Sequence, residues 1–127
     1  MGEPINDYRD LKVWFEAMSL AEAVYLETKA FPKAELFGMT SQMRRSAASV
    51  PANIAEGFGR EKTQSFIHFL RVAQGSLKEL ETHILLAQRV DLLLPEARDR
   101  LLSQTTTIGK MLRSFIRSLA NRSGGPK

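Results

Sequence analysis

A seam of apolar residues runs through residues 63–90, and it restricts the possible folds of this chain more than any other feature. Its members recur at alternating steps of four and three residues: Phe66, Leu70, Ala73, Leu77, Leu80, Ile84 and Ala87. This heptad spacing places one narrow apolar stripe along a long helix, and it is typical of left-handed bundles whose helices cross at about 20°. Such a stripe has to be buried against other helices. The seam therefore predicts a helical bundle.

Three further segments have helical apolar spacing. Residues 10–30 should form a helix that Asp10 caps and Phe31-Pro32 ends, with the inward set Leu11, Trp14, Met18, Ala21 and Tyr25. Residues 40–58 and 95–120 should form two more, the last with Ile108, Met111, Leu112, Phe115, Ile116 and Leu119 inward. Short connections join the four helices, so we predict an all-α antiparallel up-down four-helix bundle. We expect one domain over residues 10–120, with flexible tails at 1–9 and 121–127.

Pro51 lies in the middle of the predicted second helix. A proline inside a helix removes a backbone donor and frees one carbonyl group, at a cost of roughly 3 kcal/mol. The apolar spacing continues in phase across Pro51, so we expect one helix with a kink there. The alternative is that Pro51 ends one helix and a second helix begins.

A polar stripe runs along this second helix, on the side away from its apolar residues. Its members recur at steps of three and four: Gln42, Arg45, Ser49, Asn53 and Glu56. The stripe can be a hydrogen-bonded network between subunits, a ligand site with Arg45 as the anion contact, or a solvated face. Arg and Glu on one stripe favour mutual pairing, so we expect Arg45 to pair with Glu79 or Glu56.

The predicted third helix has a second notable face, formed by Val72, Gly75, Glu79, His83 and Leu86. A glycine costs roughly 1 kcal/mol in a helix interior, and it lets another backbone approach closely. We therefore interpret the face around Gly75 and Glu79 as an interface, either to the second helix or to another subunit. The alternative is a tolerated glycine on a solvated face.

The residue types offer little for catalysis or for a bound cofactor. The chain has no cysteine, and its two histidines, His68 and His83, form no HExxH pattern. No carboxylate pair stands out as an acid and base couple. We expect no enzymatic activity, no cofactor and no metal. No apolar run approaches the roughly 20 residues of a membrane span, and no signal peptide is visible, so a cytoplasmic location is expected.

Positive charge gathers towards the end of the chain. Residues 1–88 carry 10 basic and 11 acidic side chains, whereas residues 89–127 carry 8 basic and 3 acidic ones. Lys110, Arg113 and Arg117 recur at steps of three and four on a face away from the apolar set, and Arg122 and Lys127 extend the charge. These candidate contacts fit the backbone of RNA or DNA with weak sequence preference, because no aromatic platform accompanies them. The alternative is a solvated helix face.

Two motifs carry a resemblance to a known family. QMRRSAASVPANIAEGFGR at residues 42–60 and GSLKELETHILLAQ at residues 75–88 resemble the signatures of the 23S rRNA-intervening sequence proteins, and DLKVWFEAMSLAEAVY at residues 10–25 fits the family's first helix. The resemblance implies a small four-helix bundle that assembles into a ring, typically a pentamer, in a bacterial-type cytoplasm. It implies no established activity. A related accessory protein of diversity-generating retroelements is a pentamer thought to contact nucleic acid and a reverse transcriptase.

Together these features predict a non-enzymatic homo-oligomer, pentameric by resemblance, whose basic surface holds nucleic-acid backbone. The competing hypothesis is a scaffold for protein partners in which the basic face has no role. Salt-sensitive binding to RNA or DNA separates the two.

Overall fold

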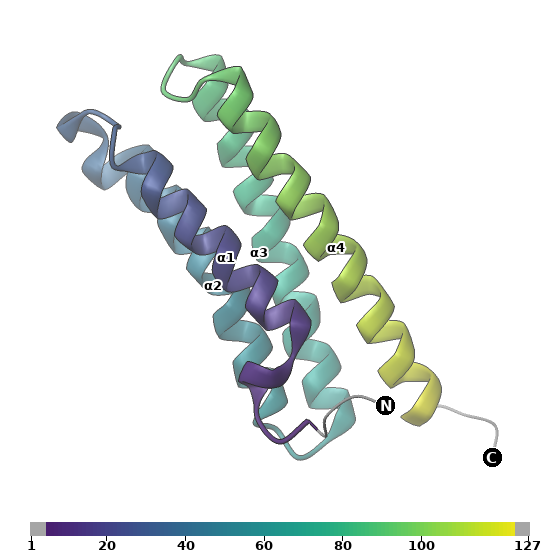
Figure 1. The fold of residues 1–127 in the computed structure, drawn as a ribbon. Coiled ribbons are helices and arrows are strands. Elements are labelled where there is room, and N and C mark those ends of the chain that lie inside the picture. The colour runs from purple at the N-terminus through teal and green to yellow at the C-terminus, as the bar shows by residue number, and fades with distance from the viewer. Residues whose placement is uncertain (1–4, 124–127) are drawn as a thin grey trace.

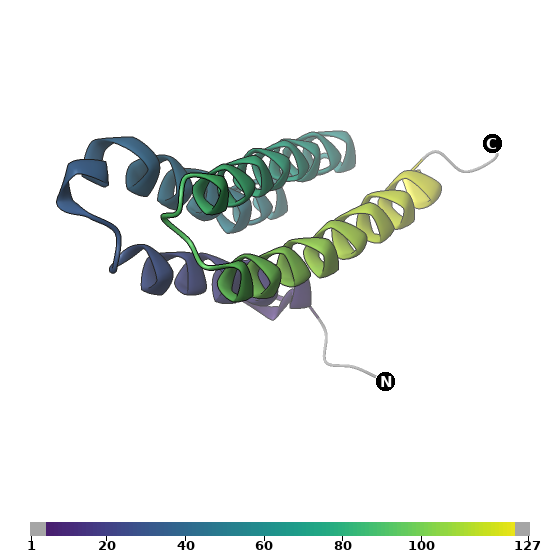
Figure 2. The same ribbon diagram turned by 90° about the horizontal axis from the view of Figure 1, so that it is seen from above.

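The structure, a computed structural model, describes residues 5–123. Four long helices make up most of this range: α1 (Lys12–Thr28), α2 (Ser41–Phe58), α3 (Thr63–Arg89) and α4 (Pro95–Ser123). The described residues form no strand. Each helix packs on the next, and α4 packs back on α1 (Figure 1). Seen from above, α2 and α3 lie on one side and α1 and α4 on the other (Figure 2). The predicted antiparallel up-down four-helix bundle is confirmed.

The apolar seam of α3 lies in the core, as predicted. Six of its seven members are buried: Leu70, Ala73, Leu77, Leu80, Ile84 and Ala87. The remaining member, Phe66, is half-buried, and its ring meets Phe58 of α2 and Phe115 of α4 edge to face, with centroids 6.0 and 5.3 Å apart. Helix α3 therefore supplies the surface on which both α2 and α4 pack.

The predicted inward face of α1 is confirmed in part and wrong in part. Leu11 and Ala21 are buried, as predicted, and Trp14 is half-buried and packs on the core. The buried residues of this helix are Val13, Ala17, Leu20, Ala21, Val24 and Thr28. Met18 and Tyr25, both expected in the core, are 44% and 45% exposed. The helix carries two apolar stripes side by side, and the stripe with smaller side chains is the one that faces the core. The larger side chains are left on the outer surface of the bundle.

Helix α2 continues through Pro51 as one element, so the alternative of two separate helices is wrong. Pro51 is buried together with Ala47, Val50 and Ile54. The kink expected at Pro51 stays a prediction. Non-helical backbone geometry occurs earlier, in the connection from α1. There η2 (Lys33–Glu35) and η3 (Leu36–Thr40) lead into α2, and Gly38 has a non-helical backbone with φ −109° and ψ −114°.

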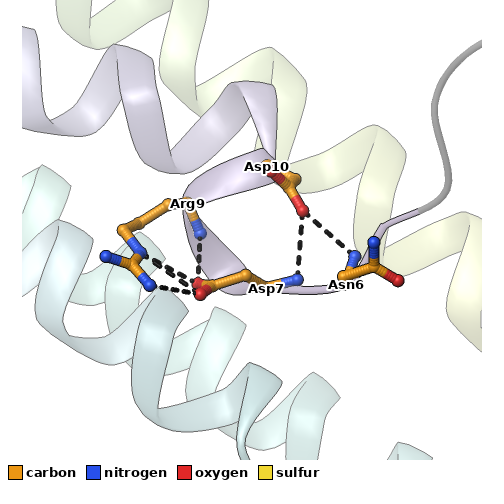
Figure 3. A network of polar contacts seen from close by, with 4 residues as sticks. All are labelled: Asn6, Asp7, Arg9 and Asp10. Carbon is orange, nitrogen blue, oxygen red and sulfur yellow. Dashed lines mark hydrogen bonds and ion pairs between the residues drawn. The ribbon is translucent and has the colours of Figure 1, made fainter.

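A short 3-10 turn, η1 (Tyr8–Asp10), precedes α1 (Figure 3). The Asp10 carboxylate accepts hydrogen bonds from the backbone N–H groups of Asn6 and Asp7, at 3.0 and 3.1 Å. Asp7 is therefore the N-cap of η1, and Asp10 is its partner in a capping box. The residue at the N-cap of α1 is Leu11, so the predicted cap is wrong. Hydrogen bonds from the Arg9 guanidinium and from the Arg9 N–H lower the pKa of Asp7 to about 2.

Asp91 ends the third helix in a left-handed conformation, with φ 64°. The N–H of Leu92 donates to the carbonyl of Ala87 at 2.9 Å, and the N–H of Asp91 donates to that of Gln88 at 3.1 Å. These two bonds form a Schellman motif, which satisfies carbonyls at the end of a helix. The fourth helix extends to Ser123, beyond its predicted end at Ala120. Of the predicted tails, residues 1–4 and 124–127, including Lys127, lie outside the described residues.

Close packing of α2 on α3 depends on Gly57, which is buried. A Cβ atom at this position would lie 2.8 Å from Cδ1 of Phe66 and 2.9 Å from Cβ of Phe69. Contacts this short require the two helices to move apart. The role of Gly57 in packing cannot be found from the sequence, because it depends on which residues of α3 lie opposite.

We expect Gly57→Ala to lower the free energy of unfolding by about 1–3 kcal/mol, because the methyl group overpacks the contact with α3. The gain in helix propensity, about 1 kcal/mol, is too small to offset this loss. Gly109→Ala is the matched control, since its Cβ would meet Cδ2 of Leu77 at an ordinary 3.6 Å. The control should be up to about 1 kcal/mol more stable than the parent. Urea unfolding at one protein concentration measures both, and a Gly57→Ala protein as stable as the parent would contradict the packing argument.

Candidate assembly and nucleic-acid surfaces

The middle of the polar stripe on α2 forms a hydrogen-bonded network with α3. The hydroxyl groups of Ser49 and Ser76 lie 2.7 Å apart. The Asn53 amide donates to the Ser49 carbonyl at 2.8 Å and to its hydroxyl at 2.9 Å. All three side chains are half-buried. This part of the stripe therefore joins two helices of one chain.

The charged ends of the stripe do not join this network. Glu56 pairs with Arg60 at 2.6 Å, and Glu79 contacts His83 at 3.5 Å. Arg45 is exposed and forms no ion pair with any residue in the range 5–123. Within one chain, the predicted pairing of Arg45 with Glu79 or Glu56 is therefore not formed. Gln42 is exposed beside it.

The face of α3 around Gly75 is open in a single chain. A Cβ atom at Gly75 would meet nothing within 4 Å, so no other backbone approaches it closely. Val72 and Leu86 on the same face are exposed. Gly75 therefore does not pack on α2, which excludes one of the two interfaces expected from the sequence. Contact with another subunit and contact with solvent both agree with this geometry.

A large apolar groove lies on the outer side of α1 and α2. It has a volume of about 820 Å³, and its walls include Trp14, Phe15, Met18 and Tyr25 of α1. Helix α2 contributes small side chains to the other wall: Ala48, Pro51, Ala52 and Ala55. Phe15 is 61% exposed. An apolar surface of this kind on a small protein is typical of a contact with another protein.

The sequence contained a signal for this groove that we did not use. Helix α1 has apolar residues on more of its circumference than one core face requires, and the two stripes together identify it as a helix covered on two sides. Reading only one stripe placed Met18 and Tyr25 in the core.

One end of the groove is held by a contact between α1 and α2. The Arg44 guanidinium lies 4.6 Å from the ring centroid of Tyr25, and its Nε donates to the hydroxyl of Thr28 at 2.8 Å. Thr28 is buried and donates in turn to the carbonyl of Val24 at 2.8 Å. Arg44 therefore fixes the end of α1 and orients one aromatic wall of the groove.

The basic residues of α4 form an exposed stripe on its second half. We call Lys110, Arg113, Arg117 and Arg122 the α4 basic stripe. The first three recur at steps of three and four on one face, and Arg122 follows five residues later, about 140° further round the helix. All four are exposed, and none forms an ion pair with a residue that the structure describes. Because no internal carboxylate neutralises them, their charge is available to an external anion.

The first half of α4 differs in this respect. Arg98 contacts Asp99 and the Gln88 side chain, both at 2.9 Å. Arg100 pairs with Glu27 of α1, also at 2.9 Å. The arginines in this half thus contact side chains of the same chain, whereas the cations of the α4 basic stripe form no such ion pairs.

Over residues 5–123, no group of three or more His, Cys, Asp or Glu side chains is placed to hold a metal ion. In the same range, no helix has both the length and the apolar character to cross a membrane.

Comparison with known families gives a match over most of this chain. Residues 9–114 match the family model described as 23S rRNA-intervening sequence protein. The chain belongs to this family. The match includes both motifs that carried the resemblance in the sequence, and it covers all of α1, α2 and α3.

A solved structure has the same fold as this member of the 23S rRNA-intervening sequence protein family. It is described as a protein with unknown function from the S23 ribosomal protein family from Bacteroides thetaiotaomicron VPI-5482. The TM-score is 0.74 at 26% sequence identity, over 82% of this chain and 97% of that one. No curated protein matches the chain.

The family match also divides the α4 basic stripe. Lys110 and Arg113 lie inside the matched residues 9–114, whereas Arg117 and Arg122 follow them. The residues that line the apolar groove between α1 and α2 lie inside the match, apart from Tyr8. The residues that match the family model therefore include most of the apolar groove and two of the four residues of the α4 basic stripe.

We expect Ser49→Ala to lower the free energy of unfolding by about 1 kcal/mol, because it removes the hydroxyl that bonds both Ser76 and Asn53. Arg45→Ala on the same helix is the matched control, and it should change the stability by no more than about 0.5 kcal/mol. Urea unfolding measures both. A larger loss for Arg45→Ala than for Ser49→Ala would contradict this account and would give Arg45 a partner in another subunit.

Proposed function

We propose that this protein is a non-enzymatic, self-assembling four-helix bundle that holds the sugar–phosphate backbone of a nucleic acid on the second half of α4. The observation that carries the proposal is the α4 basic stripe, whose four cations are exposed and unpaired among the described residues. Lys and Arg side chains that lack internal partners contribute binding energy through release of counterions from phosphates. Residues 89–127 carry 8 basic and 3 acidic side chains, which agrees with an anionic partner.

The α4 basic stripe favours contact with the backbone over base recognition. Between its cations, the outward positions of α4 carry Ser114 and Ser118, and no aromatic side chain lies among them. Sequence-specific RNA recognition generally uses aromatic platforms or reading of base edges. We therefore expect weak sequence preference and strong dependence on salt.

Self-assembly supports this function by repeating the stripe. The apolar groove between α1 and α2 lies on the opposite side of the bundle from the seam between α3 and α4, since the four helices contact one another in cyclic order. A contact through the groove thus leaves α4 exposed. The family resemblance implies a ring, typically a pentamer, in which each copy would present one α4 basic stripe. A nucleic acid that contacts several stripes at once would bind the ring more tightly than it binds one chain.

A scaffold for a protein partner is the second candidate function. Phe37 favours it, because its side chain is 94% exposed on the connection between α1 and α2. Leu36 beside it is 49% exposed. Neither residue lines the apolar groove between α1 and α2, so assembly through that groove would leave them uncovered.

We expect the protein to bind a structured RNA and a duplex DNA with an affinity that falls as the salt concentration rises from low to physiological. The triple variant Lys110/Arg113/Arg117→Ala should lose most of this affinity, with a shallower salt dependence, by about one unit of slope for each phosphate contact removed. Fluorescence anisotropy measures both quantities.

The triple variant Lys29/Lys33/Arg89→Ala is the matched control. It also removes three positive charges from exposed positions. Lys29 and Lys33 follow α1 and Arg89 ends α3, so these charges lie at the end of the antiparallel bundle where α4 begins, away from its second half. It should bind nearly as the parent does. Equal losses in the two variants would indicate a general charge effect and would contradict a site on α4. Absence of binding by the parent at low salt would favour the protein scaffold.

A further inference from the structure

A second groove lies on the outer seam between α3 and α4. Its volume is about 400 Å³. Helix α3 contributes Arg71, Gln74, Gly75 and Lys78 to its walls, and α4 contributes Gly109 and Arg113. Only one of these residues, Arg113, belongs to the α4 basic stripe. The groove therefore adds basic side chains of α3 to a surface that the sequence assigned to α4 alone.

Packing within this chain does not require the two glycines of the groove. A Cβ atom at Gly75 would meet nothing within 4 Å, and one at Gly109 would make an ordinary contact of 3.6 Å with Leu77. Gly57 is different, since its Cβ would come within 2.8 Å of Phe66. Glycine weakens a helix interior, and yet two glycines that the bundle does not need lie on facing helices at the same groove. Their absent side chains leave this groove open.

The groove has positive charge that is not neutralised inside the chain. Lys78 pairs with Glu81 at 3.1 Å, and its side chain is 73% exposed. Arg71 and Arg113 are exposed and form no ion pair with any residue from 5 to 123. Guanidinium groups present a planar fork of donors that fits phosphate oxygens. Two such groups face one opening from two different helices.

We propose that the groove formed by Arg71, Gln74, Gly75, Lys78, Gly109 and Arg113 seats phosphates of a nucleic-acid backbone, and that its glycines let the strand lie close to α3 and α4. This inference rests on the proposed nucleic-acid function and extends it to α3. The groove meets the α4 basic stripe at Arg113, and Arg117, one turn further along α4, lies on the same face. A long polyanion can follow that path, whereas a single phosphate ion would occupy only the groove.

Two variants outside the α4 basic stripe test the groove. Arg71→Ala should weaken binding of a single-stranded RNA roughly tenfold, as expected for the loss of a charge-assisted contact. Gly75→Leu should weaken it by a similar factor, because the new side chain covers the groove. Gly75→Leu should also raise the Tm, since leucine favours a helix more than glycine does. A loss of binding by a more stable protein is not a folding defect.

Arg89→Ala is the control for charge, because it also removes one exposed cation from α3. At 1.5 Å per residue, Arg89 lies about 27 Å along the helix from Arg71. It should bind as the parent does. Sedimentation of each variant should give the oligomer mass of the parent. A changed mass for Gly75→Leu would assign Gly75 to a contact between subunits and would overturn the inference.

The remaining outcomes separate the groove from the proposed function. If Lys110/Arg113/Arg117→Ala loses RNA binding while Arg71→Ala and Gly75→Leu keep it, the groove is overturned and the α4 site remains. If the parent binds no RNA at low salt, both fail. Inorganic tripolyphosphate and a poly-glutamate peptide should each displace the RNA only at a charge concentration above that of the RNA. Displacement at a lower charge concentration would overturn the groove as a nucleic-acid site, and would indicate a free phosphate compound or an acidic peptide as its ligand.

Discussion

The buried seam of α3 is the contact on which the other elements of this bundle depend. Helices α2 and α4 pack on its two flanks, and the edge-to-face rings of Phe58, Phe66 and Phe115 join all three helices. Gly57 lets α2 approach α3 closely enough for this packing. Because burial of the seam fixes α2 and α4 relative to α3, it also fixes which helix faces remain outside.

Two opposite surfaces of the bundle result from this arrangement. The outer side of α1 and α2 is apolar, since the larger side chains of α1 lie there and the smaller ones fill the core. The outer side of α3 and α4 is basic, since Arg71 and the α4 basic stripe have no internal carboxylate partners among the described residues. An apolar surface suits burial against another copy, whereas a basic surface suits an anion in water. The cyclic order of the helices keeps the two apart.

Much of the fold was predictable from the sequence, because it depends on periodicity along single helices. The seam of α3, the four helices and the inward set of α4 follow from spacing alone. On α1, Met18 and Tyr25 were wrongly predicted to lie in the core, because two apolar stripes compete for it and their relative burial depends on the width of the space between helices. The role of Gly57 could not be predicted, because it depends on the register of Phe66 and Phe69 opposite it.

The candidate surfaces were predictable to a smaller extent. The α4 basic stripe followed from spacing and from charge. The partner of Ser49 could not be found in the same way, because Ser76 lies on another helix and their contact needs the relative position of α2 and α3. The groove around Gly75 and Gly109 also joins two helices, so its cations were assigned to separate faces or left unassigned.

Sedimentation equilibrium of the full chain tests most directly the proposed self-assembly on which this account depends, in which the apolar groove between α1 and α2 is covered by another copy of the protein. The account predicts a mass several times the 14.3 kDa of one chain. It also predicts that Phe15→Glu, which places a charge in the groove, reduces the mass to that of one folded chain. A parent protein that sediments at 14.3 kDa across micromolar concentrations would contradict the claim.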